Sequence, residues 1–173
     1  MNGERWFLLK MKQTGFTLIE LMVTLVVLGI LLGIGIPSFN SVIESNKLRS
    51  VTHSLNSATQ LARSEALDRR TDAAVCRANA AFTACDFDAD WSNGWLVATQ
   101  QGTDFETAAD VTVVRVWEAV GLVVSGATDG FIFDQTGRAT ESGTLFIKND
   151  SGCRNLTVNT SGSASVQEVD PCP

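Results

Sequence analysis

The feature that most constrains this chain is a run of 16 uncharged, mostly apolar residues, Leu21 to Ile36, that directly follows one carboxylate, Glu20. Counted from Phe16, the segment has 21 residues. As an α-helix rising about 1.5 Å per residue it reaches roughly 30 Å, the thickness of the hydrocarbon core of a bilayer. We therefore expect residues 16–36 to form a transmembrane helix.

The charges around this segment predict its orientation. Three basic residues precede it, Arg5, Lys10 and Lys12, against one acid, Glu4. Because Lys and Arg stay on the cytoplasmic side, we expect the remainder of the chain to be exported. A cleaved secretory signal peptide is the alternative, but its apolar region has roughly 7–15 residues and ends at small residues such as Ala-x-Ala. This run is longer and ends at Gly35-Ile36-Pro37, so we expect the helix to stay attached.

Glu20 is unusual in this setting. A carboxylate inside an apolar helix is costly in lipid unless a partner meets it, so it marks a functional position. No Lys or Arg lies within the next two helical turns. The predicted partner is therefore an α-amino group, either of this chain or of a neighbouring one.

Gly15-Phe16-Thr17-Leu18-Ile19-Glu20, with its basic leader and apolar run, resembles a type IV prepilin (class III) signal. The resemblance implies that prepilin peptidase cleaves between Gly15 and Phe16 and N-methylates Phe16. Glu20 would then be the fifth mature residue and pair with the N-terminal amine of a neighbouring subunit. The helix would first anchor the protein in the inner membrane and then pack in a filament core. Met11-Lys12 also fits such a leader, so Met1 and Met11 both remain possible starts.

Beyond Pro37 the pattern becomes amphipathic. Five apolar residues recur at steps of 3, 4, 3 and 4 and form one stripe: Leu48, Val51, Leu55, Ala58 and Ala62. Three more residues widen this stripe: Leu61, Ala66 and Leu67. This period predicts a helix over residues 37–70 that packs one face on a globular head, residues 71–173. His53 is expected on the flank of that face, without a ligand role.

Short β-type segments alternate with turn residues in the head. Eight strands are expected, at residues 73–77, 94–100, 111–117, 122–125, 131–133, 144–148, 156–159 and 164–167. They are separated by turn sequences such as Asn93-Gly94 and Ser161-Gly162. Strands at this spacing without a second long helix predict an α+β fold, in which antiparallel sheets pack on the first helix.

One segment of the amphipathic helix and three of the head resemble the GspH/FimT family: Ala62–Ala66, Asn93–Trp95, Phe131–Arg138 and Leu156–Gly162. The resemblance implies a pilin fold, with a long N-terminal helix on two antiparallel sheets. It divides the chain into a leader (residues 1–15), a membrane and filament-core helix (residues 16–36), an amphipathic helix (residues 37–70) and a periplasmic head (residues 71–173). It implies a minor pilin in the initiation or tip complex of a type IV pilus. Its partners would be other pilins, prepilin peptidase and, before assembly, inner-membrane lipid.

Three other functions are weighed against this one. A pseudopilin H of a type II secretion system would have the same fold. The second function, a single-pass membrane protein that never assembles, does not explain why Gly15, Phe16 and Glu20 occur together. A DNA-binding minor pilin is the third, but the Gly-Arg-x-Arg motif of such relatives corresponds to Ser161–Ser165, which has no Arg. The residues after Gly15 also carry a net charge of −8 (10 basic, 18 acidic), so nucleic acid is not an expected partner.

The four cysteines, Cys76, Cys85, Cys153 and Cys172, all lie in the part expected to be exported. An even number in an oxidising compartment predicts disulfides, with three possible connectivities. We favour Cys76–Cys85 and Cys153–Cys172, because each joins sequence neighbours and the second ties down the tail. A zinc site is disfavoured, since no Cys-x-x-Cys is present.

No enzymatic or cofactor site is expected. Asp86-Phe87-Asp88-Ala89-Asp90 resembles the first half of a calcium loop, but Trp91 and Val97 stand where the loop needs Gly and Glu. A solvated acidic turn is the preferred interpretation. The chain has one His and no Gly-rich phosphate loop, so a catalytic triad or a nucleotide site is not predicted.

Overall fold

The computed structural model describes residues 15–118, 121–126 and 129–172, without the side chains of residues 34–38. The predicted leader therefore lies outside the described residues except for Gly15, and so does the alternative start at Met11. The chain divides into two compact units, residues 1–40 and 41–173, and each is described by itself. The long helix α1, Leu18–Arg69, contributes to both.

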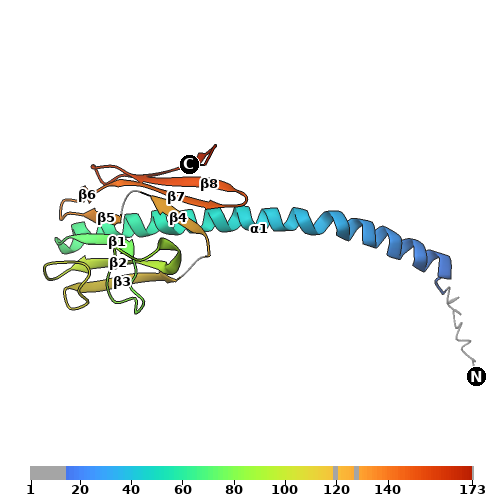
Figure 1. Ribbon diagram of the computed structural model, residues 1–173, viewed down its shortest axis with the longest axis horizontal. Coiled ribbons are helices and arrows are strands. Elements are labelled where there is room, and N and C mark those ends of the chain that lie inside the picture. The colour runs from blue at the N-terminus through green and yellow to red at the C-terminus, as the bar shows by residue number, and fades with distance from the viewer. Residues whose placement is uncertain (1–14, 119–120, 127–128, 173) are drawn as a thin grey trace, which may run out of the picture. The chain divides into compact units, whose positions relative to one another are not determined.

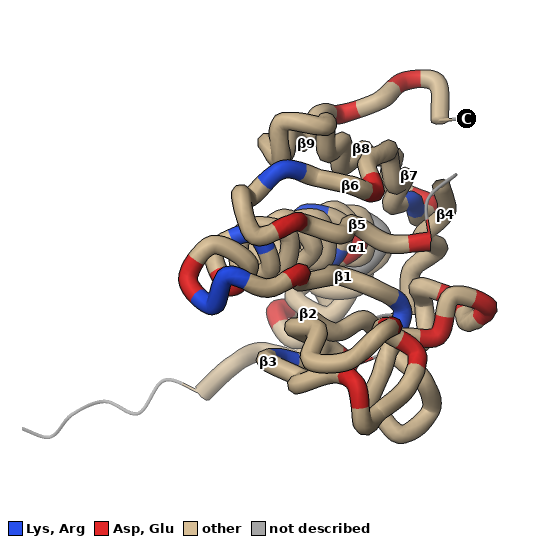
Figure 2. The backbone as a smooth tube through the Cα atoms, turned by 90° about the vertical axis from the view of Figure 1, so that its left-hand side faces the viewer, with Lys and Arg blue, Asp and Glu red and all other residues tan. Residues whose placement is uncertain are grey.

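The second unit contains the last part of α1 and nine described strands. A five-stranded antiparallel sheet has the order β3-β2-β1-β5-β6, and a four-stranded antiparallel sheet has the order β4-β7-β8-β9. The bounds are β1 Ala73–Arg77, β2 Gly94–Gln100, β3 Val111–Glu118, β4 Val123–Gly126, β5 Gly130–Phe133, β6 Ala139–Glu141, β7 Gly143–Asn149, β8 Gly152–Val158 and β9 Ala164–Val169. Figures 1 and 2 show β2 and β3 of the first sheet on one side of the helix and β8 of the second sheet on the other. This is the predicted α+β arrangement.

The predicted apolar stripe of α1 packs between the sheets. Leu48, Val51, Leu55, Ala58 and Ala62 are all buried, and they form one core with residues such as Trp95, Phe131, Leu145 and Leu156. The helix ends at Arg69, and the next residue, Arg70, has a left-handed backbone conformation (φ 53°) that stops it. Leu67 differs from the prediction, because its side chain is 45% exposed instead of extending the stripe into the core.

The five-stranded sheet has a second core on its outer face. Ala74 and Cys76 of β1 and Leu96 and Ala98 of β2 pack there with residues from two loops: Ala78, Ala84, Cys85 and Phe105. Both faces of β1 and β2 are therefore buried, which explains why these strands are almost continuously apolar instead of alternating.

Only β1 and β2 have the predicted limits, and the other predicted strands differ from the observed ones by one to four residues at one end or both. β6 was not predicted, because it has only three residues and begins directly after the turn at Gly137. β8 begins at Gly152, four residues before the predicted start, because Gly152-Cys153-Arg154-Asn155 lacks the apolar pattern that marked the rest of the strand. β4 is shifted by one residue, to Val123–Gly126.

Candidate functional site

The N-terminal end of α1 carries the predicted processing and assembly residues. Gly15, Phe16 and Thr17 precede the helix, and Phe16 is 83% exposed. The Thr17 hydroxyl accepts a hydrogen bond from the Glu20 backbone N–H at 3.3 Å. Thr17 therefore caps the helix, and Glu20 occupies the third helical position of a Thr-x-x-Glu capping sequence. The capping role of Thr17 was not predicted, although the Thr-x-x-Glu spacing is visible in the sequence.

The helix surface that follows Glu20 is apolar and uncovered. Every large apolar side chain from Leu18 to Leu32 is between 49% and 77% exposed. The Thr24 hydroxyl donates to the Leu21 carbonyl oxygen at 2.8 Å, so this polar group is satisfied within the helix. A large exposed apolar surface of this kind marks a contact site for lipid or for another protein.

Within the described residues, no helix is long and apolar enough to cross a membrane. The predicted span, residues 16–36, includes residues 34–36, whose side chains lie outside the description.

Both favoured cysteine pairs are disulfide-bonded in the structure. Cys76–Cys85 joins β1 to the loop that covers the outer face of the sheet, and both of its residues are buried. Cys153–Cys172 joins the start of β8 to the C-terminal tail. Among the described residues no cysteine is free.

The acidic segment Asp86–Asp90 forms turns. The Asp86 carboxylate accepts backbone N–H groups of Asp88 and Ala89, and Asp90 caps a short 3-10 helix by accepting the Ser92 N–H at 2.8 Å. This hydrogen bond from Ser92 lowers the pKa of the Asp90 carboxyl. In the part of the chain that the structure covers, no group of three or more His, Cys, Asp or Glu side chains is placed to hold a metal ion. His53 is exposed on the flank of α1.

Arg63 joins α1 to two turns of the head. Its Nε donates to the Gly137 carbonyl oxygen at 3.0 Å, and a terminal nitrogen donates to the Ser161 carbonyl oxygen at 3.5 Å. Gly162 lies in the same β8–β9 turn, close to the Gly137 carbonyl. Arg63, Gly137 and Gly162 belong to three separate family-like segments of the sequence, and the structure brings them together.

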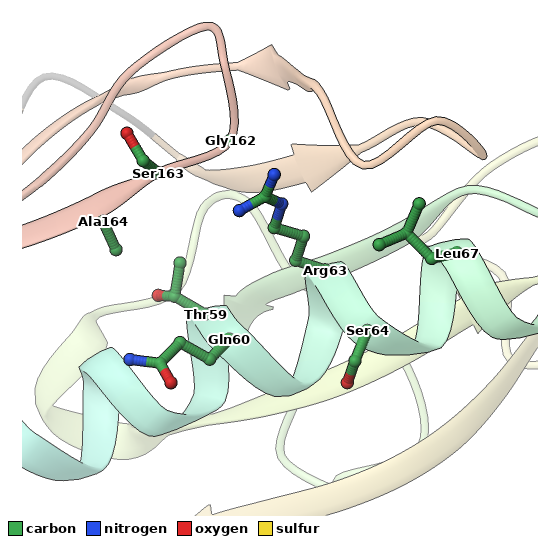
Figure 3. Close-up of a pocket in the computed structure, with 8 residues that line it drawn as sticks. All are labelled: Thr59, Gln60, Arg63, Ser64, Leu67, Gly162, Ser163 and Ala164. Carbon is green, nitrogen blue, oxygen red and sulfur yellow. The ribbon is translucent and has the colours of Figure 1, made fainter.

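A groove opens beside Arg63. It lies between α1 and the β8–β9 turn, and Figure 3 shows the Arg63 side chain directed from the helix toward that turn. The groove has a volume of about 430 Å³ and is lined by Thr59, Gln60, Arg63, Ser64, Leu67, Gly162, Ser163 and Ala164. The groove was not predicted from the sequence, because its two walls are about 100 residues apart in the chain.

Two family models match the chain. Residues 10–36 match the prokaryotic N-terminal methylation motif, which implies processing by prepilin peptidase. Residues 51–162 match the model described as type II transport protein GspH. No curated protein matches the chain.

Solved structures match the fold. Two crystal forms of the type IV minor pilin FimU of Pseudomonas aeruginosa superpose with TM-scores of 0.57 and 0.55, at 21% and 20% identity. They cover 75% and 72% of this chain and 95% and 96% of their own. The fold is therefore the pilin fold, a long N-terminal helix packed on two antiparallel sheets. Since the GspH model covers more than half of the 173 residues, the chain belongs to the GspH family of pilin-like structural proteins.

Proposed function

We propose that this protein is a minor pilin, a structural subunit of the initiation or tip complex of a type IV pilus. The observation that carries the proposal is the uncovered apolar surface of α1 with one carboxylate in its first turn, within the segment that matches the methylation motif. Cleavage after Gly15 would place the new amine at Phe16, two residues before the helix begins. The apolar helix then sits in the inner membrane, with the head in the periplasm, until it packs among other pilin helices.

Glu20 sets the register of that packing. In an apolar environment an unpaired ion is strongly unfavourable, so a carboxylate and a neighbour's N-terminal amine stabilise only the arrangement that brings them together. Removing the carboxylate would leave the amine uncompensated. The periplasmic location is supported by the two disulfides, which persist in oxidising compartments.

The alternative is a purely local role for the Glu20 side chain, since an acid in the first turn stabilises a helix by itself. Two substitutions separate the roles. Glu20→Gln keeps a residue suited to the capping position but removes the charge, and Thr17→Val removes the cap but keeps the charge.

We expect Glu20→Gln to be inserted in the membrane and cleaved normally but to be absent from sheared filaments, measured by immunoblotting. Thr17→Val should still be incorporated. Normal incorporation of Glu20→Gln would refute the charge-pairing role.

Mass spectrometry of the native N-terminus should find N-methyl-Phe, and a chain that keeps its leader would refute the pilin assignment.

The second candidate function is that of a pseudopilin H in a type II secretion system, which the description of the matching family model favours. Deletion of the gene distinguishes the two. Loss of surface pili with normal export of secreted proteins supports the minor pilin. Normal surface pili with loss of protein export supports the pseudopilin.

A further inference from the structure

The two sheets of the second unit end in four described strands that pair on one side only: β3, β6, β4 and β9. An open edge exposes unpaired backbone groups, and proteins protect such edges by shortness, bulges or charges. β6 has three residues and β4 has four. β3 pairs with β2 across a register shift and carries Arg115 and Glu118. β9 has six residues, pairs with β8 without a shift and carries one charge, Glu168. β9 is therefore the least protected of these four edges.

The hydrogen-bond pattern identifies the backbone groups that β9 leaves open. The Asn159 N–H donates to the Ser163 carbonyl oxygen at 3.1 Å. Ala164 and its partner on β8 are therefore a non-hydrogen-bonded pair of the antiparallel ladder. By alternation, the N–H and C=O groups of Ala164, Val166 and Glu168 point away from β8, toward the open edge.

The groove described above begins where β9 begins, since Gly162, Ser163 and Ala164 form one of its walls (Figure 3). Among the described residues that line it, Arg63 is the one charged side chain. Arg63 uses two nitrogens to hold the turns, and a guanidinium carries five N–H donors. Donors therefore remain for an acceptor in the groove, and the positive charge selects a carboxylate.

The apolar side chains along this edge are incompletely covered. Ala164 and Val166 pack against the main core but are only partly buried, and Leu67 is exposed beside the groove. The chain's own tail does not fill the groove, because Cys172 is bonded to Cys153, opposite the other end of β9. One added strand would pair the open backbone groups and cover these side chains.

We propose that the β9 edge docks an extended segment of a partner pilin subunit, which adds to the four-stranded sheet as a further strand and places a carboxylate on Arg63. Main-chain hydrogen bonds would supply the affinity, and the groove would supply the specificity. The proposal rests on the proposed function for the nature of the partner, and on the structure for the edge, the groove and the charge.

The backbone test uses the full chain in the cell that assembles it. Val166→Pro removes one outward N–H and leaves the bonds between β8 and β9 intact, while Val166→Thr keeps the N–H and the β-branched shape. We expect Val166→Pro to lower the amount of this chain in sheared filaments by about tenfold or more, the equivalent of one lost interaction of 1.4 kcal/mol. Val166→Thr should remain near the wild-type level.

The charge test uses the exposed Gln60, which lines the groove. Gln60→Glu should lower incorporation by about tenfold, while Gln60→Lys should not, because the two introduce opposite charges at one site. Equal incorporation of these two variants, or wild-type incorporation of Val166→Pro, would overturn the proposal. If Val166→Pro fails to accumulate in the membrane, the Gln60 pair decides. Absence of the wild-type chain from every filament would instead overturn the proposed function.

Discussion

Arg63 connects segments that are distant in the sequence. Its two carbonyl partners lie 74 and 98 residues away, and its side chain is partly buried between the turns that contain them. Hydrogen bonds from a charged group contribute more than neutral ones, because the donor is costly to leave unpaired. Arg63 therefore fixes the β5–β6 and β8–β9 turns to α1.

Replacing Arg63 by Ala should lower the free energy of unfolding by about 1.5–3 kcal/mol. Arg69→Ala is the matched control, because Arg69 forms an exposed pair with Glu65 within the helix that contributes only about 0.3–0.5 kcal/mol. Urea unfolding of the full chain in detergent, followed by fluorescence of the buried Trp91 and Trp95, measures both. Equal effects of the two substitutions would show that Arg63 holds no turns.

Gly162 is required by space as well as by conformation. It has φ 78°, and a Cβ there would collide with the Gly137 carbonyl oxygen. Gly152 also has a positive φ, 150°, but its added Cβ would meet only Leu48 Cδ2 at 3.9 Å. Gly162→Ala should therefore destabilise the protein by roughly 3 kcal/mol or more and Gly152→Ala by roughly 1–2 kcal/mol. The same urea titration measures both, and the reverse order would contradict this packing.

At the scale of elements, the two disulfides stabilise different structures. Cys76–Cys85 lies inside the outer core of the five-stranded sheet, whereas Cys153–Cys172 restrains the tail after β9. Their sequence separations are 9 and 19 residues. Chain entropy alone favours the longer loop by only about 0.7 kcal/mol, with each bond contributing about 3 kcal/mol. Buried contacts should therefore decide which of the two disulfides stabilises the protein more.

We expect the double substitution of Cys76 and Cys85 by Ala to destabilise the chain more than that of Cys153 and Cys172, despite the shorter loop. Besides the lost bond, it removes two buried sulfur atoms from a packed core, whereas in the other pair Cys153 is buried and Cys172 is exposed. Chemical denaturation of the two variants tests this order. A larger loss for the Cys153–Cys172 variant would mean that chain entropy outweighs packing here.

At the scale of the whole molecule, three turn carboxylates make stability depend on pH. Hydrogen bonds lower the pKa of Asp90, Asp110 and Asp134, chiefly from the Ser92 and Thr103 N–H groups and the Thr136 hydroxyl, respectively. When the pKa of a group is lower in the folded state than in the unfolded state, the unfolded chain binds more protons at pH values between the two pKa values. This stabilisation is therefore complete above the ordinary Asp value of about 3.9 and is lost as the pH falls through the lower folded values.

The unfolding temperature should stay constant with respect to these groups between neutral pH and about pH 5, and then fall in more acidic solution. Asp134→Asn removes one titrating group and should flatten the acidic part of the profile. Scanning calorimetry of both proteins across this range measures the difference. Parallel profiles would show that the Asp134 hydrogen bonds do not discriminate between its two protonation states.

Much of the architecture follows from local sequence patterns. The spacing of Leu48, Val51 and Leu55 predicted the buried face of α1 because helical periodicity acts over a few residues. β1 and β2 were predicted with their observed limits because β-branched and apolar runs between turn residues are also local. The pilin fold was predicted from a resemblance that spans most of the chain, and the family and structural matches confirm it.

Tertiary structure alone decided how distant parts meet. The Arg63 contacts, the groove and the open edge of β9 depend on which turns lie next to α1, and no local pattern encodes contacts between residues 74 to 98 positions apart. The exposure of Leu67 has the same cause, because Ala66 next to it is buried by the head while Leu67 lies at the groove beside the helix. Local chemistry thus determined the elements and the processing signal, while long-range packing decided which of their surfaces remain available to a partner.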